Sequence, residues 1–327
     1  MADDRAELLL IGAAKPAIVG GLEPHFTLHR LVEAKDPDAF IAEIAPRIRG
    51  IAVAYTANRI DGAFMSRFPK LEIVASFGVG YDHVDAKWAG EHSIVVTNTP
   101  DVLNEEVADT ALGLLLCTLR ELPQAERHVR AGKWTQGAYP LTKGTLRNRR
   151  VGMVGMGRIG KAIARRLEAF GVPVVYHSRN PQAGVAYKYY PKLVDMARDV
   201  DTLMVIVPGG AATKNLIDAD VLKALGPDGV LINMARGTVV DEPALIKALQ
   251  DKTIMSAGLD VFVNEPQVPE ELIAMDHIVL FPHLGSASAE TRRAMDQLVV
   301  DNLKSWFAGK GPLTPVPETP VPASHGG

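Results

Sequence analysis

Three glycines spaced as G-x-G-x-x-G constrain this chain most, because of the segments that surround them. The run RVGMVGMGRIGK places them at Gly155, Gly157 and Gly160. The residues before the turn (VGMVG) have the pattern of a strand, those after it (IGKAIARRLEAFG) that of a helix, and VPVVYH that of a second strand. This order within about 30 residues is typical of the dinucleotide-binding half of a Rossmann fold. Gly155 then permits the tight turn, Gly157 lets backbone approach a pyrophosphate, and Gly160 lets helix pack on strand.

The end of the second predicted strand indicates which dinucleotide is bound. NAD-binding proteins usually carry an Asp or Glu about 20 residues after the glycines, where it bonds the ribose hydroxyls. Here the sequence VVYHSRN places Ser178 and Arg179 at that point. A carboxylate would repel a 2′-phosphate, whereas a hydroxyl and a guanidinium bind one through charge-assisted hydrogen bonds. These residues predict NADP(H) as the cofactor; the alternative is that Arg179 is a solvated surface residue.

Short apolar runs alternate with amphipathic stretches along most of the 327 residues. The length predicts two domains, and the alternation predicts parallel α/β sheets that are buried on both faces. Long helices are expected from Asn104 and over Ala289–Ala308, and the proline-rich tail from Pro312 is expected to be extended or disordered. The expected strands are Leu8–Ile11, Ile51–Tyr55, Ile73–Phe77, Ile94–Asn98, Val151–Gly155, Val174–Tyr176, Thr202–Val207, Val230–Asn233 and Ile278–Phe281.

Composition argues against several classes of function. A net charge of −3 with 22% charged residues indicates neither a nucleic-acid nor a membrane surface. The basic cluster Arg147–Arg150 is interpreted as a solvated loop. The single cysteine, Cys117, excludes an internal disulfide framework and, with an N-terminus that lacks a basic signal-peptide region, predicts a cytoplasmic protein. His25 and His29 have no third ligand nearby in the sequence, so no metal site is expected.

Three polar residues in the second half of the chain follow predicted strands or strand-like runs. Arg236 follows VLIN, Glu265 ends GLDVFVNE, and His283 lies in FPHLGSAS. Ligands of an open parallel sheet bind beyond the carboxyl ends of its strands, so these side chains could face one crevice. Reduction of a 2-oxo acid needs a cation for its oxygens and a proton donor, which Arg and His supply, and a neighbouring Glu stabilises imidazolium. Each residue alone could equally be a loop, turn or strand-end residue; together they favour a site.

From about residue 70 to residue 316, the sequence resembles the D-2-hydroxyacid dehydrogenase family, and within it the glyoxylate/hydroxypyruvate and hydroxyphenylpyruvate reductases. The matching segments are FGVGYDHVD, NTPDVLNEEVADTALGLLL, GMGRIGKAIARRLEAFG, ARGTVVDEPAL, GLDVFVNEP and PHLGSAS. The resemblance implies two doubly wound parallel-sheet domains. A Rossmann NADP-binding domain, residues 102–286, would be inserted into a flavodoxin-like substrate-binding domain, residues 1–101 plus 287–327. It also implies an active site in the cleft and a homodimer.

The resemblance also implies roles for single residues. Arg236 would bind the carboxylate and carbonyl oxygens of the substrate, His283 would be the general acid/base, and Glu265 would orient it. The amides of Val79 and Gly80 would hold the substrate carboxylate, a backbone anion site. The implied cofactor-binding residues are Thr110, Gly155, Gly157, Arg158, Ile159, Gly160, Ser178, Arg179, Pro208 and Asp260.

The activity implied is the NADPH-dependent reduction of small 2-oxo acids, hydroxypyruvate and glyoxylate first, to D-2-hydroxy acids. Reduction of 4-hydroxyphenylpyruvate is an alternative, because the sequence does not predict the geometry of the loops expected to set substrate specificity. These loops are Tyr55–Asn58, the segment around Leu103, and Trp134–Tyr139. Trp134 would either reach the active site of the partner subunit, as in some relatives, or pack in the dimer interface. Two other activities of the family are disfavoured. Formate dehydrogenases carry Gln where Glu265 stands, and phosphite dehydrogenases carry Lys where Val79 stands. From another class, a dinucleotide-sensing corepressor that binds without turnover stays open.

Overall fold

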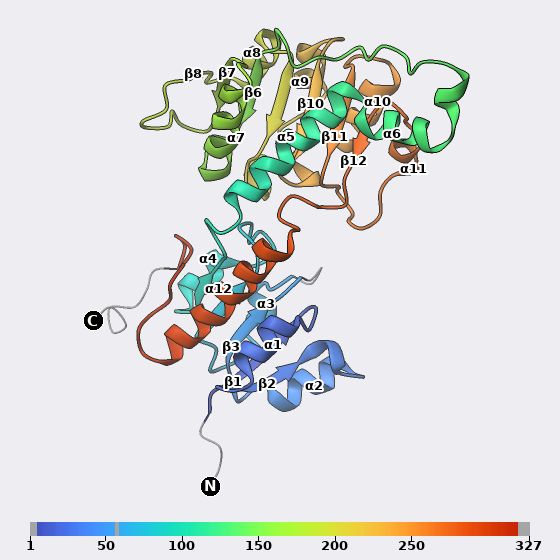
Figure 1. Cartoon of the computed structure of the whole chain (residues 1–327). Helices are drawn as coiled ribbons and strands as arrows, with labels where there is room; N and C mark the ends of the chain where they lie inside the picture. The colour runs from blue at the N-terminus through green and yellow to red at the C-terminus, as the bar shows by residue number, and fades with distance from the viewer. Residues whose placement is uncertain (1–4, 56–58, 320–327) are drawn as a thin grey trace. The chain divides into compact units, whose positions relative to one another are not determined.

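The computed structural model describes residues 5–55 and 59–319, which form two compact units (Figure 1). Unit 1 combines the chain up to Leu103 with the chain from Ser288 onward, and unit 2 is Asn104–Ala287. Each unit contains one sheet, and the named strands pair in parallel throughout both sheets. The predicted class, two doubly wound parallel-sheet domains, is confirmed. No helix within the described ranges is both long enough and apolar enough to cross a membrane.

Unit 1 is built from the first ten elements after the N-terminus and from the last helix. Its strands are β1 (Glu7–Ile11), β2 (Thr27–Arg30), β3 (Ile48–Val53), β4 (Ile73–Ser76) and β5 (Val95–Thr97). Its helices are α1 (Pro16–Leu22), η1 (Leu31–Glu33), α2 (Pro37–Ile44), α3 (Gly62–Met65), α4 (Ala86–Glu91) and α12 (Ala289–Phe307).

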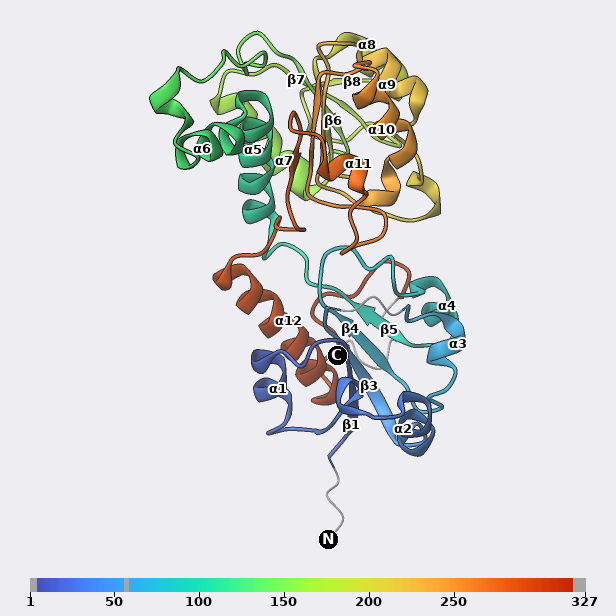
Figure 2. The same cartoon turned by 90° about the vertical axis from the view of Figure 1, so that its right-hand side faces the viewer.

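The sheet of unit 1 has the order β2-β1-β3-β4-β5, which is the flavodoxin-like order. Figure 2 shows α1 and α12 on one face of this sheet and α3 and α4 on the other. The central strands are therefore covered on both sides, which explains why Leu8–Ile11 is a continuous apolar run with no exposed side chain. The helix predicted over Ala289–Ala308 is confirmed as α12.

An extended segment after α12 covers the β5 edge of this sheet. Pro315 forms an antiparallel bridge with Thr97, and the amide of Val316 donates to the carbonyl of Val96 at 2.9 Å. The hydroxyl of Thr319 accepts from the amide of Val96 at 3.0 Å. Proline suits such an edge position because the outer side of the segment needs no N–H donor. The proline-rich tail is thus extended at Pro315 and Val316 and then turns, with the amide of Thr319 donating to the carbonyl of Val316 at 3.1 Å; residues 320–327 lie outside the described part of the chain.

Unit 2 contains the longer sheet and the helices on both of its faces. Its strands are β6 (Val151–Val154), β7 (Val174–His177), β8 (Lys188–Tyr189), β9 (Thr202–Val205), β10 (Val230–Asn233), β11 (Ser256–Leu259) and β12 (Val279–Leu280). Its helices are α5 (Asn104–Arg120), α6 (Leu122–Arg130), η2 (Lys133–Gln136), α7 (Arg158–Ala169), α8 (Leu193–Asp199), η3 (Ala211–Thr213), α9 (Ala219–Leu225), η4 (Gly237–Val239), α10 (Glu242–Gln250) and α11 (Glu270–Ile273).

The sheet of unit 2 has the order β12-β11-β10-β9-β6-β7-β8: β7 and β8 extend it on one side of β6, and β9 to β12 extend it on the other. In a doubly wound sheet the ligand crevice opens at such a switch point, beyond the carboxyl ends of the strands. Figure 2 shows α5 and α7 on one face of this sheet and α8, α9 and α10 on the other. Arg165 and Arg166 of α7 bond to Glu105 of α5, which ties these two helices together.

Three strands, β2, β8 and β11, are absent from the list of strands predicted from the sequence. β2 (TLHR) is a half-buried edge strand without an apolar run, and β8 is an edge strand of two residues. β11 (SAGL) is fully buried, but it is made largely of small residues with low strand propensity. Apolar periodicity therefore finds the centres of these sheets more readily than their edges.

The interpretation of Arg147–Arg150 as a solvated loop is wrong for Arg149, which is buried. Its guanidinium donates to the carbonyl of Asp201 at 2.7 Å and to that of Asp228 at 3.1 Å. These carbonyl groups lie just before β9 and β10, at the amino ends of two neighbouring strands. A buried arginine with several donors can satisfy them together, so this cation braces the amino end of the sheet.

Candidate active site

The glycine turn between β6 and α7 is fixed by close backbone contacts at two of its three glycines. Gly155 has a φ of +103°, and a Cβ there would lie 2.5 Å from the carbonyl oxygen of Ile206. A Cβ on Gly160 would lie 2.5 Å from the carbonyl oxygen of Gly155. By contrast, a Cβ on Gly157 would have no protein atom within 4 Å. The first and third glycines are required by the fold, whereas the second faces open space.

The helix that follows this turn begins without a side-chain cap. α7 starts at Arg158, and its N-cap is Gly157, which has no side chain to accept from the first amides. Backbone donors at a helix N-terminus, together with the helix dipole, favour a bound anion. The amides of Arg158 and Ile159 and the open space at Gly157 therefore fit the pyrophosphate of a dinucleotide.

The residues after β7 present an unneutralised positive charge. Arg179 is exposed, and its side chain makes no hydrogen bond or ion pair within the described ranges. The hydroxyl of Ser178 donates to the carbonyl of Asn180 at 2.6 Å. Pro208 follows β9 and accepts the hydroxyl of Thr213 at 2.7 Å. Because β7, β6 and β9 are consecutive in the sheet, these residues share its carboxyl edge with the glycine turn, and Arg179 fits an anionic group there.

The structure brings Glu265 and His283 into direct contact. The Oε2 atom of Glu265 lies 2.7 Å from Nδ1 of His283, and its Oε1 accepts the amide of Phe262 at 3.0 Å. Burial raises the pKa of Glu265, but the hydrogen bond and charge of His283, the amide of Phe262 and the charge of Arg236 together bring it below its usual range. Glu265 is therefore held as a carboxylate facing the imidazole ring.

Arg236 reaches this pair through a close backbone approach. A Cβ on the next residue, Gly237, would lie 1.9 Å from the carbonyl carbon of Phe262, so only glycine fits. This contact holds the turn after β10 against the segment that leads to Glu265. The Nη1 atom of Arg236 donates to the carbonyl of Ala235 at 2.8 Å, and its charge lowers the pKa of Glu265. The structure thus gathers a guanidinium, a carboxylate and an imidazole at one edge of unit 2.

Asn233 supports the arginine turn and was not identified from the sequence. Its Nδ2 donates to the carbonyl of Arg236 at 3.0 Å, and its Oδ1 accepts the amide of Ala235 at 3.0 Å. The side chain is 1% exposed, and its bonds among the described residues are to nearby backbone. A buried Asn as the last residue of a strand, three positions before the arginine, is the signal that could have indicated this role.

Asp260 braces the loop between β12 and α12, residues 281–288, which carries His283 and is called the histidine loop below. Its Oδ1 accepts the amide of Leu284 at 2.6 Å, its Oδ2 accepts the amide of Gly285 at 2.9 Å, and its carbonyl accepts the amide of His283 at 2.9 Å. Burial raises the pKa of Asp260 and outweighs the amides and His283, which lower it. The hydroxyl of Thr110 donates to the carbonyl of Gly285 at 3.2 Å. Two residues expected at the cofactor therefore meet on the histidine loop, where His283 has a φ of +52°.

Val79 and Gly80 lie in unit 1, directly after the turn that follows β4. Gly78 has a φ of +124° and donates to the hydroxyl of Thr99 at 2.9 Å, and the carbonyl of Val79 accepts Nδ2 of Asn98 at 2.9 Å. Within the described chain, neither the amide of Val79 nor that of Gly80 donates a hydrogen bond. Two consecutive unpaired amides form a backbone site that suits a carboxylate.

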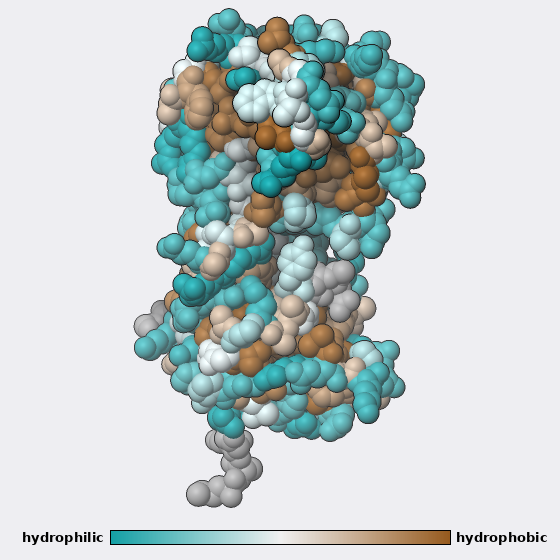
Figure 3. Space-filling view, turned by 45° about the vertical axis from the view of Figure 1, so that its right-hand side comes forward, coloured by the Kyte–Doolittle hydropathy of each residue, from teal (hydrophilic) through white to brown (hydrophobic). Residues whose placement is uncertain are grey.

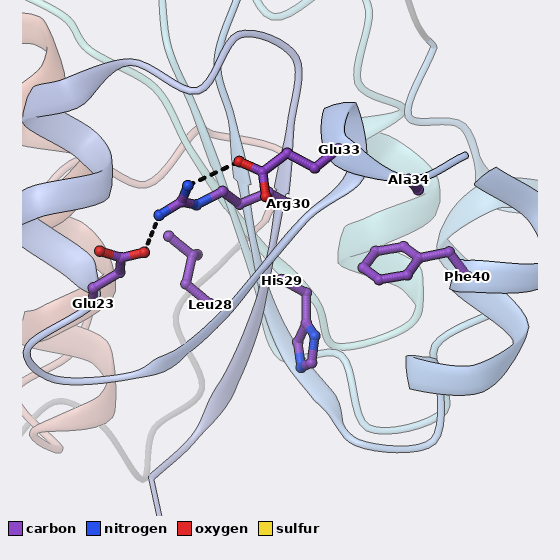
Figure 4. Close-up of a pocket in the computed structure, with 7 residues that line it drawn as sticks. All are labelled: Glu23, Leu28, His29, Arg30, Glu33, Ala34 and Phe40. Atoms are coloured by element: carbon purple, nitrogen blue, oxygen red, sulfur yellow. Dashed lines mark hydrogen bonds and ion pairs between the residues drawn. The ribbon is translucent and has the colours of Figure 1, made fainter. Parts of the chain in front are cut away.

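A surface pocket of unit 1 is lined by none of these residues. Figure 4 shows Arg30 between Glu23 and Glu33, and its guanidinium bonds to both carboxylates. The positive charge is therefore neutralised by the chain itself. The pocket is lined by Glu23, Leu28, His29, Arg30, Glu33, Ala34 and Phe40.

The segments expected to set substrate specificity are only partly described. Residues 56–58 of the segment Tyr55–Asn58 lie outside the described residues. Tyr55 is 57% exposed, Leu103 is buried, and Trp134 is 66% exposed.

Comparisons with known proteins agree with this arrangement. The family described as D-isomer specific 2-hydroxyacid dehydrogenase, NAD binding domain, matches residues 112–285. The chain is 48% identical over 295 residues to a glyoxylate/hydroxypyruvate reductase of Arabidopsis thaliana, and 44% identical over 295 residues to a hydroxyphenylpyruvate reductase of Plectranthus scutellarioides. Each alignment covers 90% of this chain and 94% of the relative.

A solved structure is similar over nearly the whole chain. It is the NADPH-dependent glyoxylate/hydroxypyruvate reductase of Sinorhizobium meliloti in complex with NADP and malonate. The two proteins are 55% identical, with a TM-score of 0.92, over 97% of this chain and 98% of the other.

Proposed function

The chain belongs to the D-2-hydroxyacid dehydrogenase family, and on that basis we propose that it reduces hydroxypyruvate and glyoxylate with NADPH. The products are D-glycerate and glycolate. The observation that carries the proposal is the 2.7 Å contact between Glu265 and His283 beside Arg236, in the unit that contains the glycine turn. The names of the Arabidopsis and Sinorhizobium relatives support this substrate class.

His283 is the general acid in this proposal. Since its Nδ1 is bonded to Glu265, proton transfer to the carbonyl oxygen of the substrate falls to Nε2. The carboxylate of Glu265 stabilises the protonated ring and fixes its orientation. Arg236 binds the carboxylate and carbonyl oxygens of the substrate. It also stabilises the negative charge that develops on the carbonyl oxygen. Bound NADPH supplies the hydride to the carbonyl carbon.

The remaining residues bind substrate and cofactor. The unpaired amides of Val79 and Gly80 are proposed to hold the substrate carboxylate. The glycine turn, Gly155, Gly157 and Gly160, with the amides of Arg158 and Ile159, holds the pyrophosphate, and Ser178 with Arg179 binds the 2′-phosphate. The NADP complex of the Sinorhizobium relative supports this cofactor. Thr110, Pro208 and Asp260 complete the proposed cofactor-binding set.

We also propose that the protein is a homodimer, associated through α6 and the loop after it. No residue of α6 is buried, and this part of the chain exposes several large apolar side chains. They are Leu122 (48% exposed), Val129 (55%), Trp134 (66%) and Leu141 (98%). Figure 3 shows hydrophobic side chains at the surface of unit 2. Apolar groups concentrated in one exposed segment are typical of an association surface.

A cytoplasmic location is also part of the proposal. The sequence has one cysteine, Cys117, so the chain contains no thiol pair for an internal disulfide. Cys117 is half-buried, and burial raises the pKa of its thiol. Chains without such pairs are typical of reducing compartments.

The test is a steady-state assay of NADPH oxidation with hydroxypyruvate, glyoxylate and 4-hydroxyphenylpyruvate, repeated with NADH. The proposal expects kcat/KM to be highest with NADPH and one of the two small substrates. Preference for 4-hydroxyphenylpyruvate would instead favour the alternative that the Plectranthus relative supports. Binding of NADPH without turnover of any 2-oxo acid would contradict the proposal that the protein is an enzyme and would favour a dinucleotide sensor.

A further inference from the structure

We propose that Tyr176 and Tyr189 are positioning residues for the 2′-phosphate of NADP(H), because their hydroxyl groups fix both ends of the loop that carries Arg179. This loop, Ser178–Gln182, is called the SRNPQ loop below. The inference rests on the proposed function in one respect, namely that Ser178 and Arg179 bind the 2′-phosphate. Neither tyrosine touches the ligand in this proposal; both act through the loop backbone.

Tyr189 fixes the beginning of the SRNPQ loop. Its hydroxyl donates to the carbonyl of Ser178 at 3.1 Å. Tyr189 belongs to β8, a strand of two residues at the edge of the sheet, and its register partner in β7 is Tyr176. The two rings are 5.3 Å apart and tilted by 50°. A very short edge strand adds little to a sheet through its backbone, so its contribution here is the placement of Tyr189.

Tyr176 fixes the end of the SRNPQ loop. It is 2% exposed, and its hydroxyl accepts the amide of Gln182 at 2.9 Å. A buried phenol has its hydroxyl in a defined place, because the ring cannot change rotamer without disturbing the core. The amide of Gln182, the last residue of the loop, is therefore held at a fixed point.

Bonds within the loop complete its restraint. The carbonyl of Asn180 accepts Nε2 of Gln182 at 3.2 Å. It also accepts the hydroxyl of Ser178 at 2.6 Å, a bond that this hydroxyl gives up when it donates its one proton to the phosphate. The backbone is thus anchored on each side of Arg179, while the guanidinium itself is exposed and has no partner within the described residues. A cation presented by an ordered backbone binds an anion with less loss of conformational entropy than one on a mobile loop.

The consequence concerns selectivity between cofactors. The 2′-phosphate is the group by which NADPH differs from NADH. Loosening the SRNPQ loop should therefore weaken the binding of NADPH and leave the binding of NADH unchanged. Tyr189→Phe tests this, because it keeps the ring and its contact with Tyr176 but removes the bond to Ser178. Tyr187→Phe is the matched control, because it removes a nearby hydroxyl that bonds to Glu168 of α7 and not to the loop.

The experiment measures binding of adenosine 2′,5′-bisphosphate and of 5′-AMP by titration calorimetry, and kcat and KM with NADPH and NADH. For Tyr189→Phe we expect a Kd for the bisphosphate about 3- to 10-fold higher, as for the loss of one hydrogen bond. The Kd for 5′-AMP, the constants for NADH and kcat with NADPH should stay as in the wild type, and KM for NADPH should rise. Tyr187→Phe should leave all of these values unchanged. Tyr176→Phe should repeat the selective effect.

Two further outcomes separate this inference from the phosphate site itself. If Arg179→Ala weakens binding of the bisphosphate but Tyr189→Phe does not, the positioning role is overturned and the phosphate site stands. If Arg179→Ala also has no effect, the phosphate site is wrong and the positioning role fails with it. Equal weakening of 5′-AMP and the bisphosphate by Tyr189→Phe would indicate a general loss of structure and would also overturn the inference.

Discussion

Glu265 uses each carboxylate oxygen for a different partner, the imidazole of His283 and the amide of Phe262. These contacts and the charge of Arg236 bring its pKa below the ordinary value of 4.5, although burial alone would raise it. A carboxyl group whose pKa is lower in the folded state stabilises that state above its unfolded pKa. This stabilisation is lost as the pH falls through the folded-state pKa.

Glu265→Gln should therefore change how stability depends on pH. Near neutral pH the variant should be less stable, by about 1–3 kcal/mol, because Gln offers one oxygen to two donors and replaces a charge-assisted bond by a neutral one. As the pH falls below about 5, the wild type should lose this advantage and the two melting temperatures should converge. Melting temperatures measured across this range check the prediction, and parallel curves would contradict it.

Asp260 accepts two backbone amides and so determines where the histidine loop lies. Asp260→Asn leaves one oxygen for two amides and places an NH₂ group against a donor. The cost should be about 1–3 kcal/mol, because a buried amide loses its acceptor. Since His283 moves with this loop, kcat should fall as well.

A helix cap provides the control for this variant. Asp218 accepts the amide of Val221 at the start of α9, and Asp218→Ala should cost about 1 kcal/mol. Thermal unfolding and steady-state kinetics should then separate the two variants. Both should be less stable, but only Asp260→Asn should lose kcat; equal kcat values would show that Asp260 has no effect on the site.

The turn between β6 and α7 contains two glycines with opposite expected behaviour. Gly155 has a positive φ and no room for a Cβ, whereas Gly157 has an ordinary φ of −76° and open space. Gly155→Ala should destabilise the protein by about 1–3 kcal/mol through backbone strain and contact with Ile206. Gly157→Ala should keep the melting temperature, because the fold does not need a glycine there.

Gly157→Ala, which should leave stability unchanged, should instead weaken cofactor binding. In Gly157→Ala the added methyl group would occupy space assigned to the pyrophosphate, and the Kd for NADPH should rise by about tenfold or more. Fluorescence titration of NADPH with each purified variant measures this. An unchanged Kd for Gly157→Ala would contradict the assignment of the pyrophosphate to this turn.

The sequence predicted the elements around this turn well, and the physical reason is local. Strand, glycine turn and helix are contiguous, so their pattern is complete within a few residues of VGMVGMGRIGK. The contact between Gly237 and Phe262, the bracing of the histidine loop by Asp260 and the buried position of Arg149 all join distant segments. Sequence patterns alone carry no information on such contacts, which is why Asn233 and Arg149 were missed or misread.

At the scale of the whole molecule, the proposed dimer makes a direct prediction. Leu141 is 98% exposed in the segment that follows α6, and Leu141→Asp places a charge on the proposed association surface. Sedimentation should show a dimer for the wild type and a shift towards monomer for the variant. Val32→Asp, at an apolar residue of unit 1 that is 60% exposed, should remain a dimer. A monomeric wild type, or equal sedimentation of all forms, would contradict this assignment.

The fold class was predictable because two kinds of information agreed. Alternating apolar strands and amphipathic helices indicated parallel sheets, and the resemblance to the D-2-hydroxyacid dehydrogenase family implied that they are doubly wound, as the strand orders confirm. The edge strands β2 and β8 were not predictable, since short polar strands depend on their neighbours for stability. Tyr189, which lies on β8, was consequently not recognised as a partner of the SRNPQ loop.

The measurement that tests the central claim most directly compares the wild type with His283→Asn in two assays. One is NADPH-dependent reduction of hydroxypyruvate, and the other is NADPH binding. If His283 is the proton donor, kcat should fall by about 10²- to 10⁴-fold while the Kd for NADPH is unchanged. A variant that retains the wild-type kcat, or a wild type that binds NADPH but reduces no 2-oxo acid, would contradict the account.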